Sequence, residues 1–352
     1  MREVYRILDA NFNRAREALR VAEDCGRFAL NDPAVTAMAK NMRSDLQELL
    51  AALPVEELIA ARDTAGDIGT EITSPTEPTR KDLPDVAVAA CKRLTEALRS
   101  VEEYSKMLAP DLTLKVERMR YNAYTLEQRL LSRFLVARRF RDVELYVLVS
   151  SRLCARSLTE TARAAIAGGA GAIQLREKDT PDAAFVAMAA ELRELTDETG
   201  RLFLVNDRPD IAAIVGADGV HLGQEDLPIA ETRRLLRPHA IVGRSCHNIE
   251  QVRAAVAEGA DYVSVGPMFE TATKEAGPVA GPALLQRAAA ETGLPIVAIG
   301  GITPENAATL AAAGAACLAV SSAVCCARDP RAAAGAIRKE LPRGRPDAAP
   351  AD

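Results

Sequence analysis

Helical spacing dominates the first 140 residues of the chain. Apolar side chains recur three or four positions apart, and charged residues fill the remaining faces. The pattern predicts four helices, over residues 4–30, 33–53, 84–108 and 112–140. The second helix follows Asp32-Pro33, a capping residue with proline at the first helical position. Two helical hairpins of this length favour an all-α helical bundle as the first domain, over residues 1–140.

From residue 144 onward the pattern changes to short β-rich runs that alternate with Ala-rich helical runs. Eight strands are predicted, over residues 145–149, 172–176, 202–206, 219–222, 241–245, 262–266, 296–300 and 317–321. Eight strand-helix units favour an α/β fold, a (β/α)8 TIM barrel over residues 144–340. An open doubly wound sheet is the alternative, but its GxGxxG fingerprint is absent after the first strand. The Pro-, Ala- and charge-rich residues 341–352 are expected to form a disordered tail.

The first domain carries an internal repeat. Residues 14–24 align with residues 93–103 at an offset of 79, and Met42-Arg43 aligns with Met119-Arg120 at an offset of 77. A duplicated helical hairpin with a two-residue change of length in the turn explains both matches, and a chance match of two helices is the alternative.

Each copy of the repeat contains the pattern Glu-x-x-Arg-x-x-Glu. Its members are Glu17, Arg20 and Glu23 in the first copy, and Glu96, Arg99 and Glu102 in the second. A solvated ladder of ion pairs is the favoured interpretation. The alternative is a functional site that includes the loop 62–70, whose glycines and two carboxylates suit a phosphate and Mg²⁺.

Composition narrows the function classes. The 44 basic and 49 acidic residues give a net charge of −5, and the chain has no Trp, which argues against a nucleic-acid partner. Seven cysteines lack zinc-site spacing and are interpreted as reduced thiols. Neither a signal-peptide pattern nor a membrane-spanning apolar run is present in the sequence, so we expect a cytoplasmic protein without a membrane partner.

Polar residues gather where the predicted strands end, and in a TIM barrel all these ends face one mouth. Gln174, Arg176 and Lys178 share one side of an extended chain, which suits a multiply charged anion. Asp207 and Asp226 follow adjacent strands and suit Mg²⁺. Together these groups point to a diphosphate.

Later strand ends supply a second set of phosphate-binding candidates. Barrels commonly bind a phosphate after their seventh and eighth strands. The candidates are Gly300, Gly301, Ser321 and Ser322 at those ends, and Thr271, Thr273 and Lys274 in the loop after the sixth strand.

Residues 144–327 resemble the thiamine phosphate synthase family in seven short segments that occur in order. These are residues 174–178, 205–207, 218–226, 243–247, 266–274, 300–303 and 320–322. The resemblance implies that hydroxymethylpyrimidine diphosphate is joined to thiazole phosphate with release of diphosphate. It assigns the pyrimidine diphosphate to Gln174, Arg176, Lys178, Asn206, Ser245 and Lys274, with Arg176, Lys178, Ser245 and Lys274 as the catalytic residues. It assigns Mg²⁺ to Asp207 and Asp226, and the thiazole phosphate to Thr271, Thr273, one or both of Gly300 and Gly301, and Ser321 and Ser322.

Three further residues near these segments remain open. Arg244 stands where the family often has a smaller residue, and it either contacts a phosphate or points away. His247 either contacts substrate or packs, whereas His221 lies within a strand and is expected in the core or behind the site.

Residues 1–140 resemble a helical domain found fused to such synthases, in segments 7–17, 61–70 and 96–104. That resemblance implies a hydroxymethylpyrimidine phosphate kinase with ATP as co-substrate, which makes the diphosphate that the barrel consumes. One alternative is that the bundle is a non-catalytic module that forms a homo-oligomer. The other is that the barrel is a thiazole tautomerase-like protein that binds thiazole phosphate without coupling it.

Overall fold

The structure, a computed structural model, describes residues 1–68, 79–237, 239–270 and 279–342. Its contacts divide it into two units, Met1–Phe134 and Leu135–Asp352. The division lies earlier than the predicted end of the first domain at residue 140, because Val136 and Phe140 are buried with side chains of the second unit. Among the described residues, no helix is long and apolar enough to cross a lipid bilayer.

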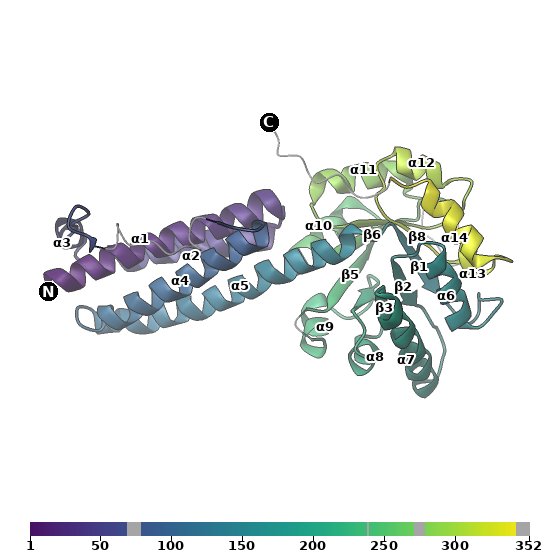
Figure 1. Ribbon diagram of the computed structural model, residues 1–352, viewed down its shortest axis with the longest axis horizontal. Helices are drawn as coiled ribbons and strands as arrows, with labels where there is room; N and C mark the ends of the chain where they lie inside the picture. Colours follow the sequence, from purple (N-terminus) through teal and green to yellow (C-terminus); the bar gives the residue numbers. More distant parts are fainter. Residues whose placement is uncertain (69–78, 238, 271–278, 343–352) are drawn as a thin grey trace. The chain divides into compact units, whose positions relative to one another are not determined.

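The first unit is built from long helices (Figure 1). They are α1 (Arg2–Asp24), a π-helical turn η1 (Cys25–Ala29), α2 (Pro33–Ala51), α3 (Val55–Ala60), α4 (Leu83–Ser105), a short 3-10 turn η3 (Pro110–Leu112) and α5 (Thr113–Arg141), which continues into the second unit. Helix α1 packs against α4 and α2. The four predicted helices are confirmed, and the Asp32 side chain caps α2 as expected by accepting from the Ala34 and Val35 N–H groups. Helix α3 was not predicted.

The duplicated pattern corresponds to a repeated ion pair. Glu23 on α1 pairs with Arg43 on α2, and Glu102 on α4 pairs with Arg120 on α5 at 2.8 Å. The ion pairs of the predicted ladder are present, because Arg20 lies 3.9 Å from Glu23 and Arg99 lies 2.6 Å from Glu102. The ladder is not solvated at Glu23 and Glu102, which are 6% and 4% exposed. Glu17 is exposed, as a solvated position requires. Each buried carboxylate thus pairs with two arginines, one within the Glu-x-x-Arg-x-x-Glu motif and one on the following helix.

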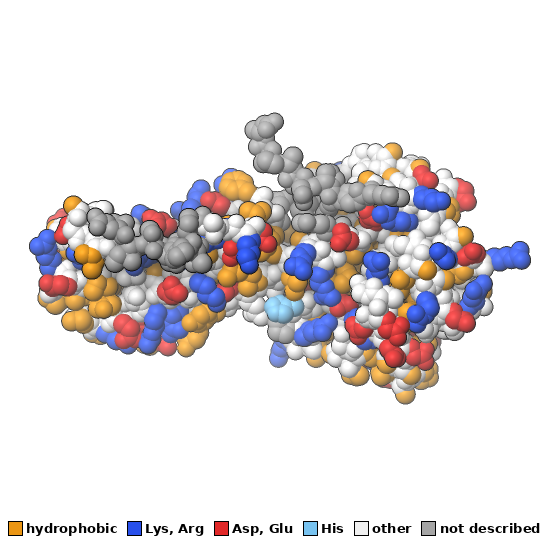
Figure 2. All heavy atoms as spheres, in the orientation of Figure 1, with side chains coloured by type: hydrophobic (Ala, Val, Ile, Leu, Met, Phe, Trp, Pro, Cys, Tyr) orange, Lys and Arg blue, Asp and Glu red, His pale blue; other side chains and the backbone are white. Residues whose placement is uncertain are grey.

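Around these buried pairs, the surface of the helical unit mixes both signs of charge. Positive and negative side chains are interspersed over the face in view (Figure 2). This agrees with the sequence, in which residues 1–143 carry 23 basic and 23 acidic side chains.

The second unit is a closed barrel of eight parallel strands (Figure 1). The strands are β1 (Leu145–Val149), β2 (Ala172–Leu175), β3 (Leu202–Asn206), β4 (Gly219–Leu222), β5 (Ile241–Cys246), β6 (Tyr262–Val265), β7 (Ile296–Ile299) and β8 (Leu318–Val320). Neighbours pair in chain order, and β8 returns to β1 through Leu145 to Leu318 and Val147 to Val320. The predicted TIM barrel is confirmed.

Helices follow the strands and surround the barrel. They are α6 (Leu158–Ala167), α7 (Asp182–Thr199), α8 (Pro209–Ile214), α9 (Ile229–Leu235), α10 (Ile249–Glu258), α11 (Gly281–Glu291), α12 (Ala307–Ala312), α13 (Ser322–Cys325) and α14 (Pro330–Lys339). Strand residues alternate between two cores: Val147 packs outward toward the helices, and Tyr146 and Leu148 point into the barrel. Leu341, the first residue of the predicted tail, is 4% exposed and belongs to the outer core, so that part of the prediction is wrong. Residues 343–352 lie outside the described residues.

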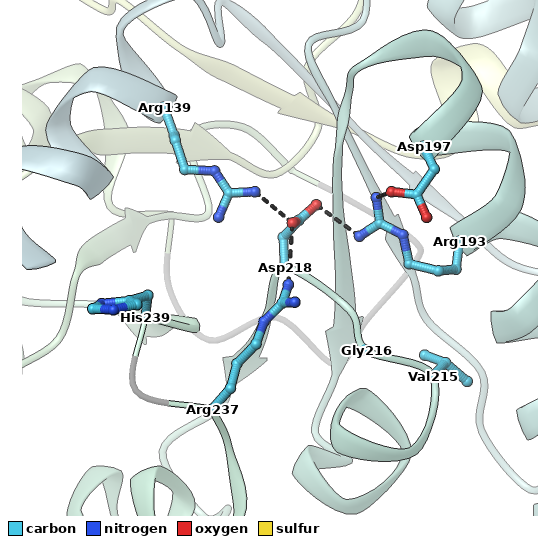
Figure 3. A pocket seen from close by; sticks show the side chains of 8 residues that line it. All are labelled: Arg139, Arg193, Asp197, Val215, Gly216, Asp218, Arg237 and His239. Atoms are coloured by element: carbon cyan, nitrogen blue, oxygen red, sulfur yellow. Dashed lines mark hydrogen bonds and ion pairs between the residues drawn. The ribbon is translucent and has the colours of Figure 1, made fainter.

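A buried carboxylate, Asp218, stands at the N-terminal end of β4. It accepts from the Phe203 N–H at 2.8 Å and from three guanidinium groups, those of Arg139 on α5, Arg193 on α7 at 2.9 Å and Arg237 at 3.5 Å (Figure 3). Burial acts to raise the pKa of Asp218, but the Phe203 N–H and the arginines outweigh it and hold this pKa below its usual range.

The pocket around Asp218 is a structural feature of the barrel. His239 and Asp197 also line it (Figure 3). It lies at the opposite ends of the strands from the predicted mouth, because Asp218 precedes β4 and Asp226 follows it. Its arginines connect the end of α5 with helix α7 and the segment after α9.

We expect Asp218→Asn to lower the free energy of unfolding by about 3 kcal/mol, because it leaves three guanidinium groups without their common anion. Urea titration at pH 7 measures this change. The control is Asp197→Asn, which removes a two-thirds-exposed carboxylate from the same pocket and should cost less than about 1 kcal/mol.

The loss of unfolding free energy in Asp218→Asn should also depend on pH. A lowered folded-state pKa stabilises the protein above the unfolded-state pKa of about 3.9, and this stabilisation disappears as the pH falls through the folded-state value. The difference between variant and wild type should therefore shrink below about pH 4. An equal stability of the two proteins at pH 7 would contradict the assignment.

Candidate active site

Two carboxylates meet at the C-terminal ends of β3 and β4. Asp207 directly follows β3, and the loop after β4 carries Asp226. The two carboxyl groups lie close enough for Asp226 to act on the protonation of Asp207. Burial, followed by this contact with Asp226, raises the pKa of Asp207 to about 7, and the nearby charges of Arg176 and Lys178 act in the opposite direction. The structure thus brings the two acids and the two cations of the prediction together.

The backbone holds this acidic pair in place. Asp207 has a φ of +60°, in the left-handed region that side chains other than glycine rarely occupy, and its N–H donates to the His221 carbonyl at 2.8 Å. The Asp226 carboxylate accepts from the Gly223 N–H. Strained backbone that the surrounding structure fixes in this way is typical of functional sites.

The donor chemistry of the pair fits Mg²⁺. Both ligands offer carboxylate oxygens, which hard cations prefer, and a bound cation would offset the repulsion between them. Among the described residues, no group of three or more His, Cys, Asp and Glu side chains is placed to hold a metal ion. Mg²⁺ at Asp207 and Asp226 would therefore keep coordination positions for water and for substrate oxygens.

The segment that follows β2 carries side chains with two different roles. Glu177 is buried and accepts from the Ser151 N–H and from its hydroxyl at 2.7 Å, which fixes the loop after β1. Lys178, the next residue, is exposed, and Arg176 on the other side of Glu177 is half-buried.

A chain of hydrogen bonds crosses the barrel interior. The Gln174 side-chain amide donates to the Tyr146 hydroxyl at 2.7 Å, and this hydroxyl lies 3.1 Å from the Tyr262 hydroxyl. The Tyr262 hydroxyl lies 2.7 Å from His221 Nδ1, and His221 Nε2 lies 2.9 Å from Ser245 Oγ. The chain therefore connects two candidate residues, Gln174 on β2 and Ser245 on β5.

Sequence reasoning missed both tyrosines of this chain. They stand within apolar strands, where a tyrosine resembles any other core residue. The available signal was Gly243: a Cβ there would lie 2.1 Å from the Tyr262 ring, so the ring requires a glycine on the neighbouring strand. Burial, the largest cause, raises the pKa of Tyr146 above its usual range, so its hydroxyl remains protonated.

One atom of this hydrogen-bond chain is available to a ligand. Gln174 Oε1 is buried and has no hydrogen-bond partner within the part of the chain that the structure describes. Asn206, another candidate, is buried at the end of β3. A buried acceptor without a partner costs free energy unless a bound molecule satisfies it.

The second group of candidates forms the ends of β7 and β8. Gly300 and Gly301 have φ values of +105° and +66°, and a Cβ on Gly300 would lie 2.7 Å from Pro267. Glycine is thus required for the end of β7 to pack against the segment after β6. The Ser321 hydroxyl donates to the Leu148 carbonyl at 3.0 Å, and Ser322 begins α13 and is exposed. Thr271, Thr273 and Lys274 lie outside the described residues.

The structure shows the contacts of the three residues whose roles the sequence did not decide. Arg244 points away from the barrel interior, and its buried side chain donates to the carbonyls of Leu227 and Gln224 at 3.3 and 3.4 Å, which flank Asp226. His247 Nδ1 lies 2.7 Å from the Gly266 carbonyl, which favours packing over substrate contact. His221 is buried as expected and lies behind Ser245.

A closed parallel barrel with acids and cations at its C-terminal mouth defines a TIM-barrel enzyme that acts on small phosphorylated substrates. Residues 145–324 match the thiamine monophosphate synthase family, and residues 6–129 match the ThiD2 family. The chain belongs to the thiamine-phosphate synthase family, and it is a transferase of thiamine biosynthesis. This finding favours the synthase over the thiazole tautomerase alternative.

Relatives of this chain match it over both units. The chain is 42% identical over 346 residues to a thiamine-phosphate synthase of Nostoc sp., covering 98% of this chain and 96% of the relative. It is 42% identical to that of Synechocystis sp., covering 97% and 98%. A solved structure, thiamine phosphate pyrophosphorylase from Pyrococcus furiosus, is 38% identical with a TM-score of 0.53 and covers 57% of this chain and 96% of its own.

Proposed function

We propose that the barrel joins hydroxymethylpyrimidine diphosphate to thiazole phosphate by a dissociative, Mg²⁺-assisted displacement. The observation that carries the proposal is the juxtaposition of the Asp207–Asp226 pair with the charges of Arg176 and Lys178. Two acids next to two cations match a diphosphate that binds together with its metal ion.

The reaction begins with cleavage of the bond between the pyrimidine methylene carbon and the diphosphate oxygen. The electron pair leaves with the diphosphate, and the electron-rich aminopyrimidine ring delocalises the resulting cation. The thiazole nitrogen then attacks this carbon. Arg176, Lys178 and Lys274 neutralise the charge that accumulates on the leaving group, and no protein nucleophile is required. Mg²⁺, held by Asp207 and Asp226, would supply further charge neutralisation at the diphosphate.

The hydrogen-bond chain orients the pyrimidine. Gln174 Oε1 is an acceptor for the exocyclic amino group, and Ser245 and Asn206 complete the contacts to the same substrate. Tyr146, Tyr262 and His221 act behind Gln174 and Ser245 as positioning residues. A fixed orientation places the methylene carbon toward the thiazole nitrogen and raises the effective concentration of the attacking group.

The thiazole phosphate binds at the ends of β7 and β8. Backbone N–H groups at Gly300 and Gly301 and the segment Ser321–Ser322 provide donors, and Thr271 and Thr273 add hydroxyl groups. This places the second anion on the opposite side of the mouth from the acidic pair, so the two anionic substrates are held by separate donor sets.

We expect Asp207→Asn to lower kcat/KM for coupling by about 100-fold or more, because the metal ion loses one of its two carboxylates. Thiamine phosphate formation from the two purified substrates measures this loss. Asp210→Asn is the matched control, since Asp210 lies three residues further on and pairs with Arg208 at the surface at 2.6 Å. Near-wild-type turnover of Asp207→Asn would contradict the mechanism.

Tyr262→Phe should raise KM for the pyrimidine diphosphate about fivefold to tenfold, because the central link of the chain is lost. KM for thiazole phosphate should stay within about twofold, because that substrate binds elsewhere. Ser264→Ala on the same strand should have a smaller effect, since His221 keeps its shorter contact to Ser245. Equal changes in both KM values would mean that Tyr262 only supports folding.

We further propose that the helical unit phosphorylates hydroxymethylpyrimidine phosphate with ATP. Support comes from the ThiD2 match over residues 6–129, together with the kinase activity that the sequence resemblance implies. The product would be the substrate of the barrel, so one chain would perform two consecutive steps.

Incubation of the full chain with pyrimidine monophosphate, thiazole phosphate, ATP and Mg²⁺ tests this second proposal. Thiamine phosphate should form only when ATP is present, whereas ATP should be dispensable when pyrimidine diphosphate is supplied. In Asp207→Asn the pyrimidine diphosphate should accumulate instead. If no pyrimidine diphosphate forms with any divalent metal, the alternative is favoured, in which the helical unit is a non-catalytic module that forms a homo-oligomer.

A further inference from the structure

A cluster of charged side chains joins α1 to the segment that follows α3. The Asp9 carboxylate accepts two hydrogen bonds from Arg62, at 2.8 Å from Nε and 2.7 Å from Nη2. Arg6 donates to the Asp63 carbonyl at 2.8 Å. We call this group the Arg62 cluster; its members are Arg6, Asp9, Asn13, Arg16, Arg62 and Asp63.

The cluster is preorganised by its own contacts. Asn13 donates to the Asp9 carboxylate at 3.3 Å, and its carbonyl oxygen accepts from Arg16 at 3.0 Å. Positions 6, 9, 13 and 16 fall on one face of α1. The Asp9 side chain is only 13% exposed, whereas that of Arg62 is 50% exposed, so the carboxylate fixes the guanidinium and leaves part of it open to a ligand.

Packing of the hairpin does not require this cluster. The second copy of the repeat keeps the framework pair, because Glu102 and Arg120 correspond to Glu23 and Arg43. At the offset of 79 it has other residues where the cluster stands: Val88 for Asp9, Lys92 for Asn13 and Thr95 for Arg16. The duplicated fold thus retains the buried ion pair in both copies and the cluster in one.

The chemistry of the proposed kinase reaction favours arginine side chains at the site of phosphoryl transfer. The acceptor of the phosphoryl group is a phosphate monoester, whose second pKa is about 6, so its attacking oxygen is already deprotonated at neutral pH. A general base is therefore unnecessary. The remaining difficulty is the repulsion between two anions, and phosphoryl transfer is catalysed chiefly by cations that hold and neutralise them.

We propose that the Arg62 cluster is the phosphoryl-transfer site of the helical unit, with Arg6, Arg16 and Arg62 binding the phosphates of ATP and of the pyrimidine phosphate. This inference rests on the kinase function proposed above. An oxygen of the pyrimidine phosphate forms a bond to the γ-phosphorus as the bond from that phosphorus to the β,γ-bridging oxygen breaks. The electron pair leaves with ADP. Asp9 and Asp63 are positioning residues that hold Arg62 and Arg6.

The test uses the full chain and compares three single variants, Arg62→Gln, Arg16→Gln and Arg20→Gln. Each removes one positive charge. Arg20 is the matched control, because it lies on α1 and is 52% exposed but pairs with Glu23 and Asp24 outside the cluster. The rate at which pyrimidine diphosphate forms from pyrimidine monophosphate and ATP is measured for each variant. The affinity for ATP is measured separately, by equilibrium dialysis. Coupling of supplied pyrimidine diphosphate by the barrel serves as the internal standard.

We expect Arg62→Gln and Arg16→Gln to lower kcat/KM for diphosphate formation about 100-fold and to weaken ATP binding, with Arg20→Gln within about twofold of wild type. Coupling should be unchanged in all three. If Arg62→Gln also destabilises the bundle, Arg16→Gln decides, because the Arg16 guanidinium donates to Asn13 at the exposed end of the cluster.

Two outcomes overturn the proposal in distinguishable ways. A wild-type chain that forms no diphosphate removes the kinase function and this site with it. A wild-type chain that is active while both cluster variants keep at least a third of its rate leaves the kinase function standing and removes the Arg62 cluster as its site.

Discussion

The pairing of β8 with β1 closes eight strands into a ring, and the arrangement of charge in the second unit depends on that closure. Because every strand runs in the same direction, all N-terminal ends face one way and all C-terminal ends face the other. Strand β4 shows the consequence, since it has a carboxylate at each end. Asp218 is surrounded by three guanidinium groups and contributes to stability, whereas Asp226 lies against a second acid and two cations are nearby. One residue type thus has opposite electrostatic surroundings at the two ends of one strand.

Local arrangement, rather than total charge, determines what this chain can bind. The net charge of −5 gives no indication of anionic substrates. Repulsion between Asp207 and Asp226 is nevertheless the kind of unfavourable interaction that a cation relieves, and the cation then attracts phosphate oxygens. In the site proposed for the helical unit the order is reversed, because the Asp9 carboxylate holds Arg62 in place for an anion. In both proposed sites, acids would thus prepare the binding of phosphate, through a metal ion in one case and through guanidinium groups in the other.

The sequence predicted those features that depend on neighbours along the chain. Strand positions followed from short β-rich runs, and the mouth followed because Asp207 and Asp226 directly succeed such runs. Features that depend on partners from distant segments were missed. Glu23 is buried only because Arg43 comes from the next helix, and the tyrosines become polar links only when the barrel brings β1, β4 and β6 together. The direction of Arg244 was available from strand alternation, since its neighbour Ser245 points inward.

Gly243 limits how the proposed pyrimidine site can change. Any side chain added there would overlap the Tyr262 ring, and removal of that ring breaks the link between Tyr146 and His221. A wider or differently shaped pocket thus cannot be reached by single substitutions at this point, because each step alone either creates a clash or disconnects the hydrogen-bond chain. If the proposed site is correct, variation in substrate preference among related barrels should arise instead at positions such as Gln174. Its side-chain oxygen, which has no partner among the described residues, can change its partner without disturbing the packing of β5 against β6.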